Sequence, residues 1–161
     1  MFTNAEVVPG NTYTLSAYIK TTAFSTLATG KYGAGLVVYC YYADGTSKGF
    51  YSDYISKTTD TSINNGWRRE SVTFTVPTDT TQTSINLLFR EGIGNAYFDA
   101  VQLEEGEVAN KYNLLENSSF ENSNGTYNYT TDNMTTSDGV VSGGIDGSKG
   151  YKITGDKDNY K

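Results

Sequence analysis

The side chains best suited to chemistry in this chain are aromatic rings with polar tips, set at every second residue of predicted strands. Successive side chains of a strand point to opposite faces, so a strand with one apolar face exposes the residues in between. Tyrosine rings can stack on the C–H faces of sugars, while amide and guanidinium groups hydrogen-bond sugar hydroxyls. Five residues fall on such non-core faces: Tyr18, Tyr39, Tyr41, Asn86 and Arg90. This set predicts a carbohydrate-binding surface.

Each of these tyrosines also has an ordinary structural interpretation. Tyrosine is a favoured strand residue, whose hydroxyl reaches water while its ring packs against neighbours. For a single tyrosine this interpretation is sufficient. Several polar-tipped aromatics on one face exceed what stability requires, so the cluster is the feature that indicates binding.

The pattern of the first 112 residues predicts β-strands throughout. Apolar and polar residues alternate over 13–20 and 67–76, which is strand periodicity. Asp44-Gly45 lies between two aromatic-rich runs and predicts a hairpin. Further strands are expected at 36–42, 49–55, 85–89 and 97–103. Strands at this spacing, divided by turn signals, predict an all-β sandwich or barrel.

Charge and composition argue against several classes of function. The chain carries 12 basic and 18 acidic residues, a net charge of −6, and no histidine. The acidic balance argues against a nucleic-acid ligand, which needs a basic face. The lack of histidine excludes His-dependent catalytic triads and His-ligated zinc enzymes. No apolar run approaches the roughly 20 residues that span a bilayer, so we expect no membrane insertion.

Paired carboxylates are the remaining way in which this chain could act as an enzyme. Two carboxylates can serve as the acid and base of a glycosidase. Glu104, Glu105, Asp156 and Asp158 supply enough of them, but they lie in polar, turn-rich or terminal stretches. We therefore expect solvated charges here and no enzymatic activity.

Residues 113–161 differ in character from the rest of the chain. They are polar and glycine-rich, and by composition alone they would form a tail. Asn113–Glu121 is nevertheless typical of the opening of a domain, and Tyr151–Thr154 predicts a short strand. The single cysteine, Cys40, cannot form an intrachain disulfide and does not identify the cellular compartment.

Several segments resemble parts of jelly-roll carbohydrate-binding modules. Gly94–Gly106 has an aromatic pair, an aspartate and a hydrophobic run ending in Leu-Glu, and it resembles their last strand. Asn113–Glu121 leads from an Asn-rich start to Phe-Glu and resembles their first strand, while Pro9–Lys20 resembles a strand from mid-domain. The pair Gly66-Trp67, followed by a strand of alternating apolar and polar residues, also resembles a segment of these modules. Such modules occur in bacterial cell-surface proteins with YD (RHS-type) repeats and in secreted glycan-degrading enzymes. The resemblance implies a jelly-roll-type antiparallel β-sandwich.

The order of these segments is permuted relative to the family. In the family, the part similar to 113–161 comes first and the part similar to 1–112 follows. We expect residues 1–161 to make one module, either as a circular permutant or as a window cut out of register from a tandem array. In both cases Leu114 and Phe120 should be buried, and Lys161 should approach Met1 in a closed permutant. Exchange of 113–161 between neighbouring chains, giving a swapped dimer or filament, is a third alternative.

The resemblance also implies a function. It is that of a non-catalytic module, which attaches a larger secreted or cell-surface bacterial protein to a polysaccharide or cell-surface glycan. Its signal sequence would lie outside these residues. The alternative is a structural repeat or spacer of a surface protein, with no ligand.

Family members often hold a structural calcium ion between the glutamate after the first-strand Phe and an aspartate of the last strand. The matching residues here are Glu121 and Asp99. Ala100 stands where many relatives have a second aspartate, so one ligand is missing. Trp67 matches a tryptophan that often packs at the sandwich edge, and we expect a structural role for it.

Overall fold

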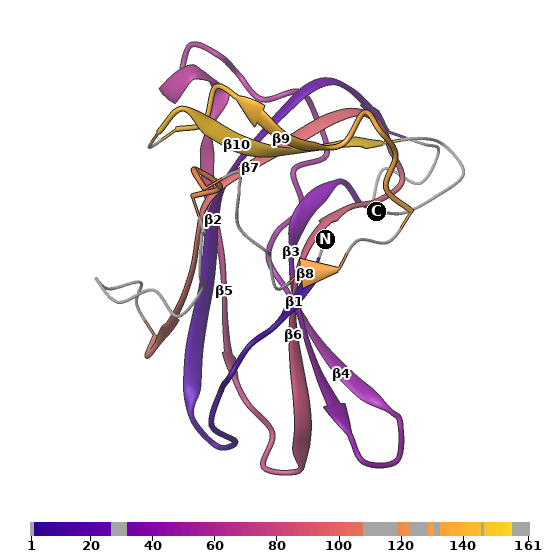
Figure 1. Ribbon diagram of the computed structural model, residues 1–161, viewed down its shortest axis with the longest axis vertical. Coiled ribbons are helices and arrows are strands. Elements are labelled where there is room, and N and C mark those ends of the chain that lie inside the picture. The colour runs from indigo at the N-terminus through magenta and orange to yellow at the C-terminus, as the bar shows by residue number, and fades with distance from the viewer. Residues whose placement is uncertain are drawn as a thin grey trace.

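Two antiparallel sheets pack face to face in the computed structural model, which describes residues 2–26, 32–107, 119–122, 129–130, 133–145 and 147–155 (Figure 1). Sheet A has the order β4 (Ser47–Tyr51), β3 (Ala34–Tyr42), β6 (Thr80–Phe89), β1 (Phe2–Asn4) and β8 (Tyr129–Thr130). Sheet B has the order β5 (Arg68–Thr75), β2 (Thr12–Thr26), β7 (Gly92–Glu105), β10 (Lys149–Gly155) and β9 (Gly139–Ser142). The prediction of an all-β antiparallel sandwich is confirmed.

The strand predicted at 49–55 ends four residues early in the structure, since the last residue of β4 is Tyr51. The next residue, Ser52, satisfies both main-chain groups of Leu36. Its N–H donates to the Leu36 carbonyl at 3.0 Å, and its Oγ accepts from the Leu36 N–H at 2.9 Å. A side-chain hydroxyl thus replaces one ladder bond, and regular pairing stops there. Ile55 forms an isolated bridge with Ala34.

The hairpin predicted at Asp44-Gly45 joins β3 to β4. Gly45 adopts a φ of +82°, a conformation that glycine tolerates best. The Asp44 carboxylate accepts bonds from the Thr46 N–H at 2.9 Å and the Thr46 hydroxyl at 2.7 Å, which lowers the pKa of Asp44. This turn fixes the register of the hairpin, which places Ser47 opposite Tyr41, Gly49 opposite Tyr39 and Tyr51 opposite Val37.

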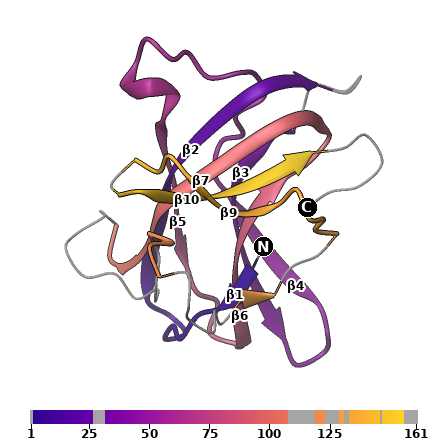
Figure 2. The same ribbon diagram turned by 45° about the horizontal axis from the view of Figure 1, so that its top comes forward.

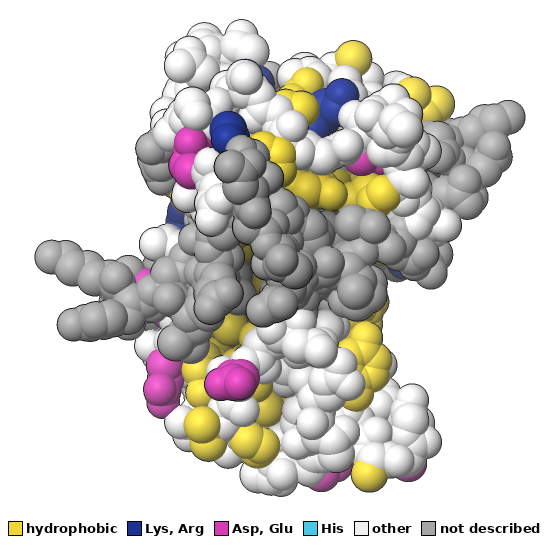
Figure 3. All heavy atoms as spheres, in the orientation of Figure 1, with side chains coloured by type: hydrophobic (Ala, Val, Ile, Leu, Met, Phe, Trp, Pro, Cys, Tyr) yellow, Lys and Arg dark blue, Asp and Glu magenta, His cyan; other side chains and the backbone are white. Residues whose placement is uncertain are grey.

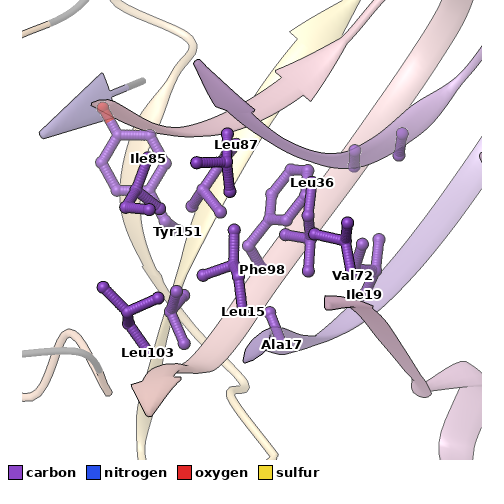
Figure 4. Packing of buried hydrophobic residues seen from close by; sticks show 14 of the residues in the cluster. Leu15, Ala17, Ile19, Leu36, Val72, Ile85, Leu87, Phe98, Leu103 and Tyr151 are labelled. Carbon is purple, nitrogen blue, oxygen red and sulfur yellow. The ribbon is translucent and has the colours of Figure 1, made fainter. Parts of the chain in front are cut away.

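Alternation along the strands builds the core between the sheets. Leu15 and Ile19 of β2 and Phe98 of β7 point toward Leu36 of β3 and Leu87 of β6 (Figure 4). All five are at most 2% exposed. Burial of such side chains contributes about 1.5–3 kcal/mol each. Because these residues must face inward, their strand neighbours must face outward.

The strands described after residue 118, namely β8, β9 and β10, belong to the same sandwich. β10 pairs with β7 from Tyr151–Phe98 to Gly155–Gly94, and β9 pairs with β10 at the edge of sheet B (Figure 2). The predicted strand at 151–154 is therefore confirmed. Phe120 is 2% exposed, as predicted, and its ring centroid lies 5.5 Å from that of Tyr151. The expectations for Leu114, Met1 and Lys161 fall outside the described residues, as does most of Asn113–Glu121.

Replacing Phe120 with alanine tests whether this segment supports the core. Phe→Ala changes at buried positions cost roughly 3–5 kcal/mol, so the free energy of unfolding should fall by an amount of that order. Urea denaturation followed by fluorescence measures it. Val8→Ala is the control, since Val8 is 56% exposed and should change stability by less than about 0.5 kcal/mol. Equal stabilities for the two variants would show that the segment is a tail.

Candidate functional site

The outer face of sheet A gathers several of the predicted binding residues. Tyr39 and Tyr41 alternate on β3 with the core residues Val38 and Cys40 and therefore point outward. On β6, Asn86 pairs with Val37 of β3. Directly opposed residues of an antiparallel pair share a face, so Asn86 lies on the same outer face. Arg90 follows β6 directly, and it lines the same hollow as Tyr39 and Asn86.

Three tyrosines form a corner of rings on this face. The Tyr39 and Tyr41 ring centroids lie 6.2 Å apart with an interplanar angle of 40°. Tyr51 meets Tyr39 edge-on, at 6.2 Å and 87°, and its hydroxyl lies 3.4 Å from that of Tyr39. Tyr51 is 51% exposed and Tyr41 is 36% exposed. The rings of Tyr41 and Tyr51 are therefore accessible. The three rings are not coplanar, so they form an angled surface and not one flat platform.

Gly49 allows Tyr51 to lie along the sheet. A Cβ at Gly49 would stand 2.5 Å from the Tyr51 hydroxyl oxygen, a distance that real contacts do not reach. The neighbouring Tyr39 is more enclosed, and burial raises its pKa far above the ordinary value for tyrosine, with the hydrogen bond to Tyr51 adding to the effect. The Tyr39 phenol thus stays neutral at physiological pH.

A hollow of about 290 Å³ lies beside this corner, lined by Val37, Tyr39, Asn86, Leu88 and Arg90. Val37 is fully buried and Leu88 is half-buried, so the lining includes apolar side chains. The Asn86 amide nitrogen donates to Ser84 Oγ at 3.1 Å and, at longer range, to the Val37 and Ser84 carbonyls. Its amide oxygen has no hydrogen-bond partner in the described part of the chain. One acceptor therefore remains for a ligand.

Two further tyrosines extend the aromatic surface beyond Arg90. The guanidinium of Arg90 lies 4.1 Å from the centroid of Tyr32, and Tyr32 meets Tyr54 edge-on at 5.6 Å. The Tyr54 ring covers Gly35, where an added Cβ would be 2.8 Å from Tyr54 Cδ1. Burial, with a smaller effect of Tyr51, raises the pKa of Tyr54 to about 12.

Sequence reasoning missed Tyr32, Tyr51 and Tyr54. For Tyr51 a signal was present, because counting outward from the Asp44-Gly45 turn pairs Val37 with Tyr51 and places it beside Tyr39. Tyr32 and Tyr54 lie outside the regular strands, so alternation carries no information about them.

Tyr18 does not join this face. It lies on β2 in sheet B, whose outer face is on the other side of the sandwich, so the expectation of a single face is wrong for Tyr18. The Arg69 guanidinium covers its ring at 4.9 Å. Arg69 in turn donates to the Ser16 hydroxyl at 2.7 Å, to the Gln102 side chain and to the Ala100 carbonyl at 3.2 Å. This network holds Tyr18 as part of the sheet surface.

Asp99 and Glu121 both contact the loop between β9 and β10. Asp99 is fully buried, and its carboxylate accepts from the Ala100 N–H at 2.7 Å and the Ile145 N–H at 2.5 Å. Glu121 accepts from the Lys149 N–H at 2.8 Å and the Ser148 hydroxyl at 2.9 Å, which lowers the pKa of Glu121. The fold thus brings the two predicted metal ligands to one loop.

Close packing of glycines against these carboxylates fixes the loop. A Cβ on Gly144 would lie 2.4 Å from an Asp99 oxygen, and one on Gly147 would lie 2.3 Å from a Glu121 oxygen. Within the described residues, no group of three or more Asp, Glu, Cys or His side chains could hold a metal ion. Asp146 falls outside those residues.

Two other sequence expectations concern single residues. Trp67 is 5% exposed, with the Lys20 ammonium 6.0 Å from its ring, which agrees with the structural role expected for it. Glu104 was expected to be solvated, and that expectation is wrong. β7 continues to Glu105 and pairs with β2, and the Glu104 side chain is fully buried opposite Thr14.

On the face shown in Figure 3, the described lysine and arginine side chains do not gather into one patch. None of the described elements is a helix long and apolar enough to cross a membrane.

Comparison with known proteins finds partial relatives. No protein-family model and no solved structure match the chain. A 68-residue segment is 37% identical to the "tRNA nuclease WapA" of Bacillus subtilis (strain 168), which covers 40% of this chain and 3% of that protein. A 60-residue segment is 38% identical to the "tRNA3(Ser)-specific nuclease WapA" of Bacillus spizizenii, covering 35% of this chain and 3% of the relative. The chain thus spans about 3% of the length of these curated relatives.

Proposed function

We propose that this chain is a non-catalytic carbohydrate-binding module, which attaches a larger secreted or cell-surface bacterial protein to a glycan. The observation that carries the proposal is the corner of three tyrosine rings, two of them exposed, beside a hollow on sheet A. Aromatic rings offer apolar faces to the C–H groups of a sugar, and Asn86 and Arg90 offer hydrogen-bonding groups to its hydroxyls.

The size of the hollow suits a short stretch of glycan. Its volume of about 290 Å³ lies just below the range of small-molecule sites, which begins near 300 Å³. Exposed Tyr51 and Tyr41 extend the surface on one side and Tyr32 on the other, so neighbouring sugar units would meet further rings. We assign no catalytic step to this face, because the residues that line the hollow include no carboxylate and no activated nucleophile.

The partial relatives are compatible with a module inside a longer protein. A segment that makes up 3% of a relative is small enough to be one unit among many in that chain. The nuclease activity in the relatives' names is not part of our proposal for this chain, whose net charge is −6.

A structural spacer without a ligand is the competing proposal, and it would explain the same partial match. A spacer needs no accessible aromatic rings, whereas Tyr51 and Tyr41 keep 51% and 36% of their surface exposed. Exposed aromatic side chains of this kind favour a binding surface over a spacer. Assembly through exchange of residues 113–161 would accompany the spacer role, and it predicts a molecular mass that rises with concentration.

Tyr39→Ala and Tyr51→Ala test the carbohydrate proposal. Each change removes one ring of the corner, so affinity for glycans identified on an array should fall about tenfold or more, since loss of an interface hot spot costs on the order of 2 kcal/mol. Isothermal titration calorimetry measures the affinity. Tyr51→Ala should leave the melting temperature nearly unchanged, because Tyr51 is half exposed.

Tyr18→Ala is the matched control, since it removes the same side chain from the outer face of the other sheet. We expect its glycan affinity to equal that of the wild-type protein. Loss of stability without loss of binding in the sheet A variants, or equal loss of binding in all three, would contradict the proposal.

Calcium at the β9–β10 loop is a further part of the proposal. Carboxylate oxygens are ligands that calcium prefers, and Asp99 and Glu121 both reach this loop. Calcium takes six to eight oxygens, so main-chain carbonyls would have to complete the set. The four carboxylate oxygens already accept hydrogen bonds, and such bonds alone could hold the loop.

Chelation separates these two accounts of the loop. A calcium ion that binds only the folded state at a hundredfold excess over its Kd contributes about 2.7 kcal/mol. EDTA should therefore lower the melting temperature measured by calorimetry, and added calcium should restore it. Glu121→Gln should remove the response to calcium. A melting temperature that EDTA leaves unchanged would show that hydrogen bonds alone fix the loop.

A further inference from the structure

Arg90 is the one charged residue among the five that line the hollow on sheet A. The others, Val37, Tyr39, Asn86 and Leu88, are neutral or apolar. A neutral glycan needs no charge at this position, since amides and hydroxyls suffice for its hydroxyl groups. The presence of an arginine beside the apolar side chains of Val37 and Leu88, in a chain of net charge −6, therefore needs a separate explanation.

Arg90 is held in place by contacts of both its main chain and its guanidinium. Its main-chain N–H donates to the Gly33 carbonyl at 3.0 Å, which extends the sheet one residue past β6. Its guanidinium stacks on Tyr32 at 4.1 Å. A guanidinium that is already oriented loses little side-chain entropy when it binds a partner.

The hydrogen-bonding fork of Arg90 is left available. Its Nε forms an ion pair with Glu91, with 3.6 Å between Nε and a carboxylate oxygen, which is beyond good hydrogen-bond distance. The two terminal nitrogens have no hydrogen-bond partner among the described residues, and the side chain is 43% exposed. The two terminal nitrogens of this lining residue therefore offer two parallel N–H donors to a ligand.

We propose that the glycan bound on this face is acidic, with the carboxylate of a uronic acid paired to the Arg90 fork. Two parallel N–H donors match the two oxygens of a carboxylate, and such bidentate pairs are the stronger class of hydrogen bond. The apolar side chains of Val37 and Leu88 reduce the local dielectric and strengthen the attraction. The Asn86 amide oxygen can accept from a hydroxyl of the same sugar. This inference rests on the carbohydrate-binding function proposed above.

The test compares oligosaccharides that contain glucuronate or galacturonate with their methyl esters, which keep the ring and remove the charge. Binding is measured by calorimetry at low and at 1 M salt. We expect the wild-type protein to bind at least one acid roughly 10- to 100-fold more tightly than its ester, as expected for a charged hydrogen-bonded pair. Arg90→Gln should bring the acid to the affinity of the ester, and Arg90→Lys should recover only part of the preference because it lacks the fork.

The outcomes of the test distinguish failure of the acidic-ligand proposal from failure of the carbohydrate-binding proposal. Equal binding of acids and esters, unchanged in Arg90→Gln, would overturn the acidic ligand and leave the carbohydrate function intact. A preference for a phosphate-bearing oligosaccharide over every uronate would also overturn it. Failure to bind any oligosaccharide would overturn both proposals. A lower melting temperature for Arg90→Gln without any change in ligand preference would show that Arg90 only supports Tyr32.

Discussion

The two-faced geometry of strand β3 is the constraint on which the rest of the structure depends. Leu36, Val38 and Cys40 are buried between the sheets, so the residues between them must point away from the core. A one-residue slip in register would move the tyrosines inward and the aliphatic side chains into water. The cost of that exchange fixes the register, and with it the positions of Tyr39, Tyr41 and Tyr51 on sheet A.

The same constraint explains how a structural framework can also carry the proposed binding surface. The hairpin at Asp44-Gly45 brings Tyr51 beside Tyr39, and the pairing of β3 with β6 brings Asn86 beside Val37. Gly49 and Gly35 leave room where the rings of Tyr51 and Tyr54 lie against the sheet. One register thus sets both the backbone pairing and the positions of the outward-facing rings, and the small residues leave room for those rings. A change to an outward-facing ring therefore need not disturb the core.

Alternation within strands was enough to predict the fold class and the outward direction of the proposed binding residues. It could not say which strands share a sheet. β2 and β3 follow one another in the chain but lie in opposite sheets, and this separates Tyr18 from Tyr39. Tyr32 and Tyr54 sit in irregular backbone, where no periodicity applies, and Glu104 is buried because β7 continues past the predicted end at Leu103. The features that the sequence did not predict are therefore sheet membership, irregular segments and strand ends, which depend on contacts between residues distant in sequence.

The most direct test of the central claim is to locate glycan binding on the molecule by NMR. Amide chemical shifts of the ¹⁵N-labelled protein are followed while a glycan identified on an array is added. The account predicts shift changes confined to β3, β4, β6 and the segment around Arg90. Changes centred on Tyr18 in sheet B or on the β9–β10 loop, or no changes with any glycan, would contradict it.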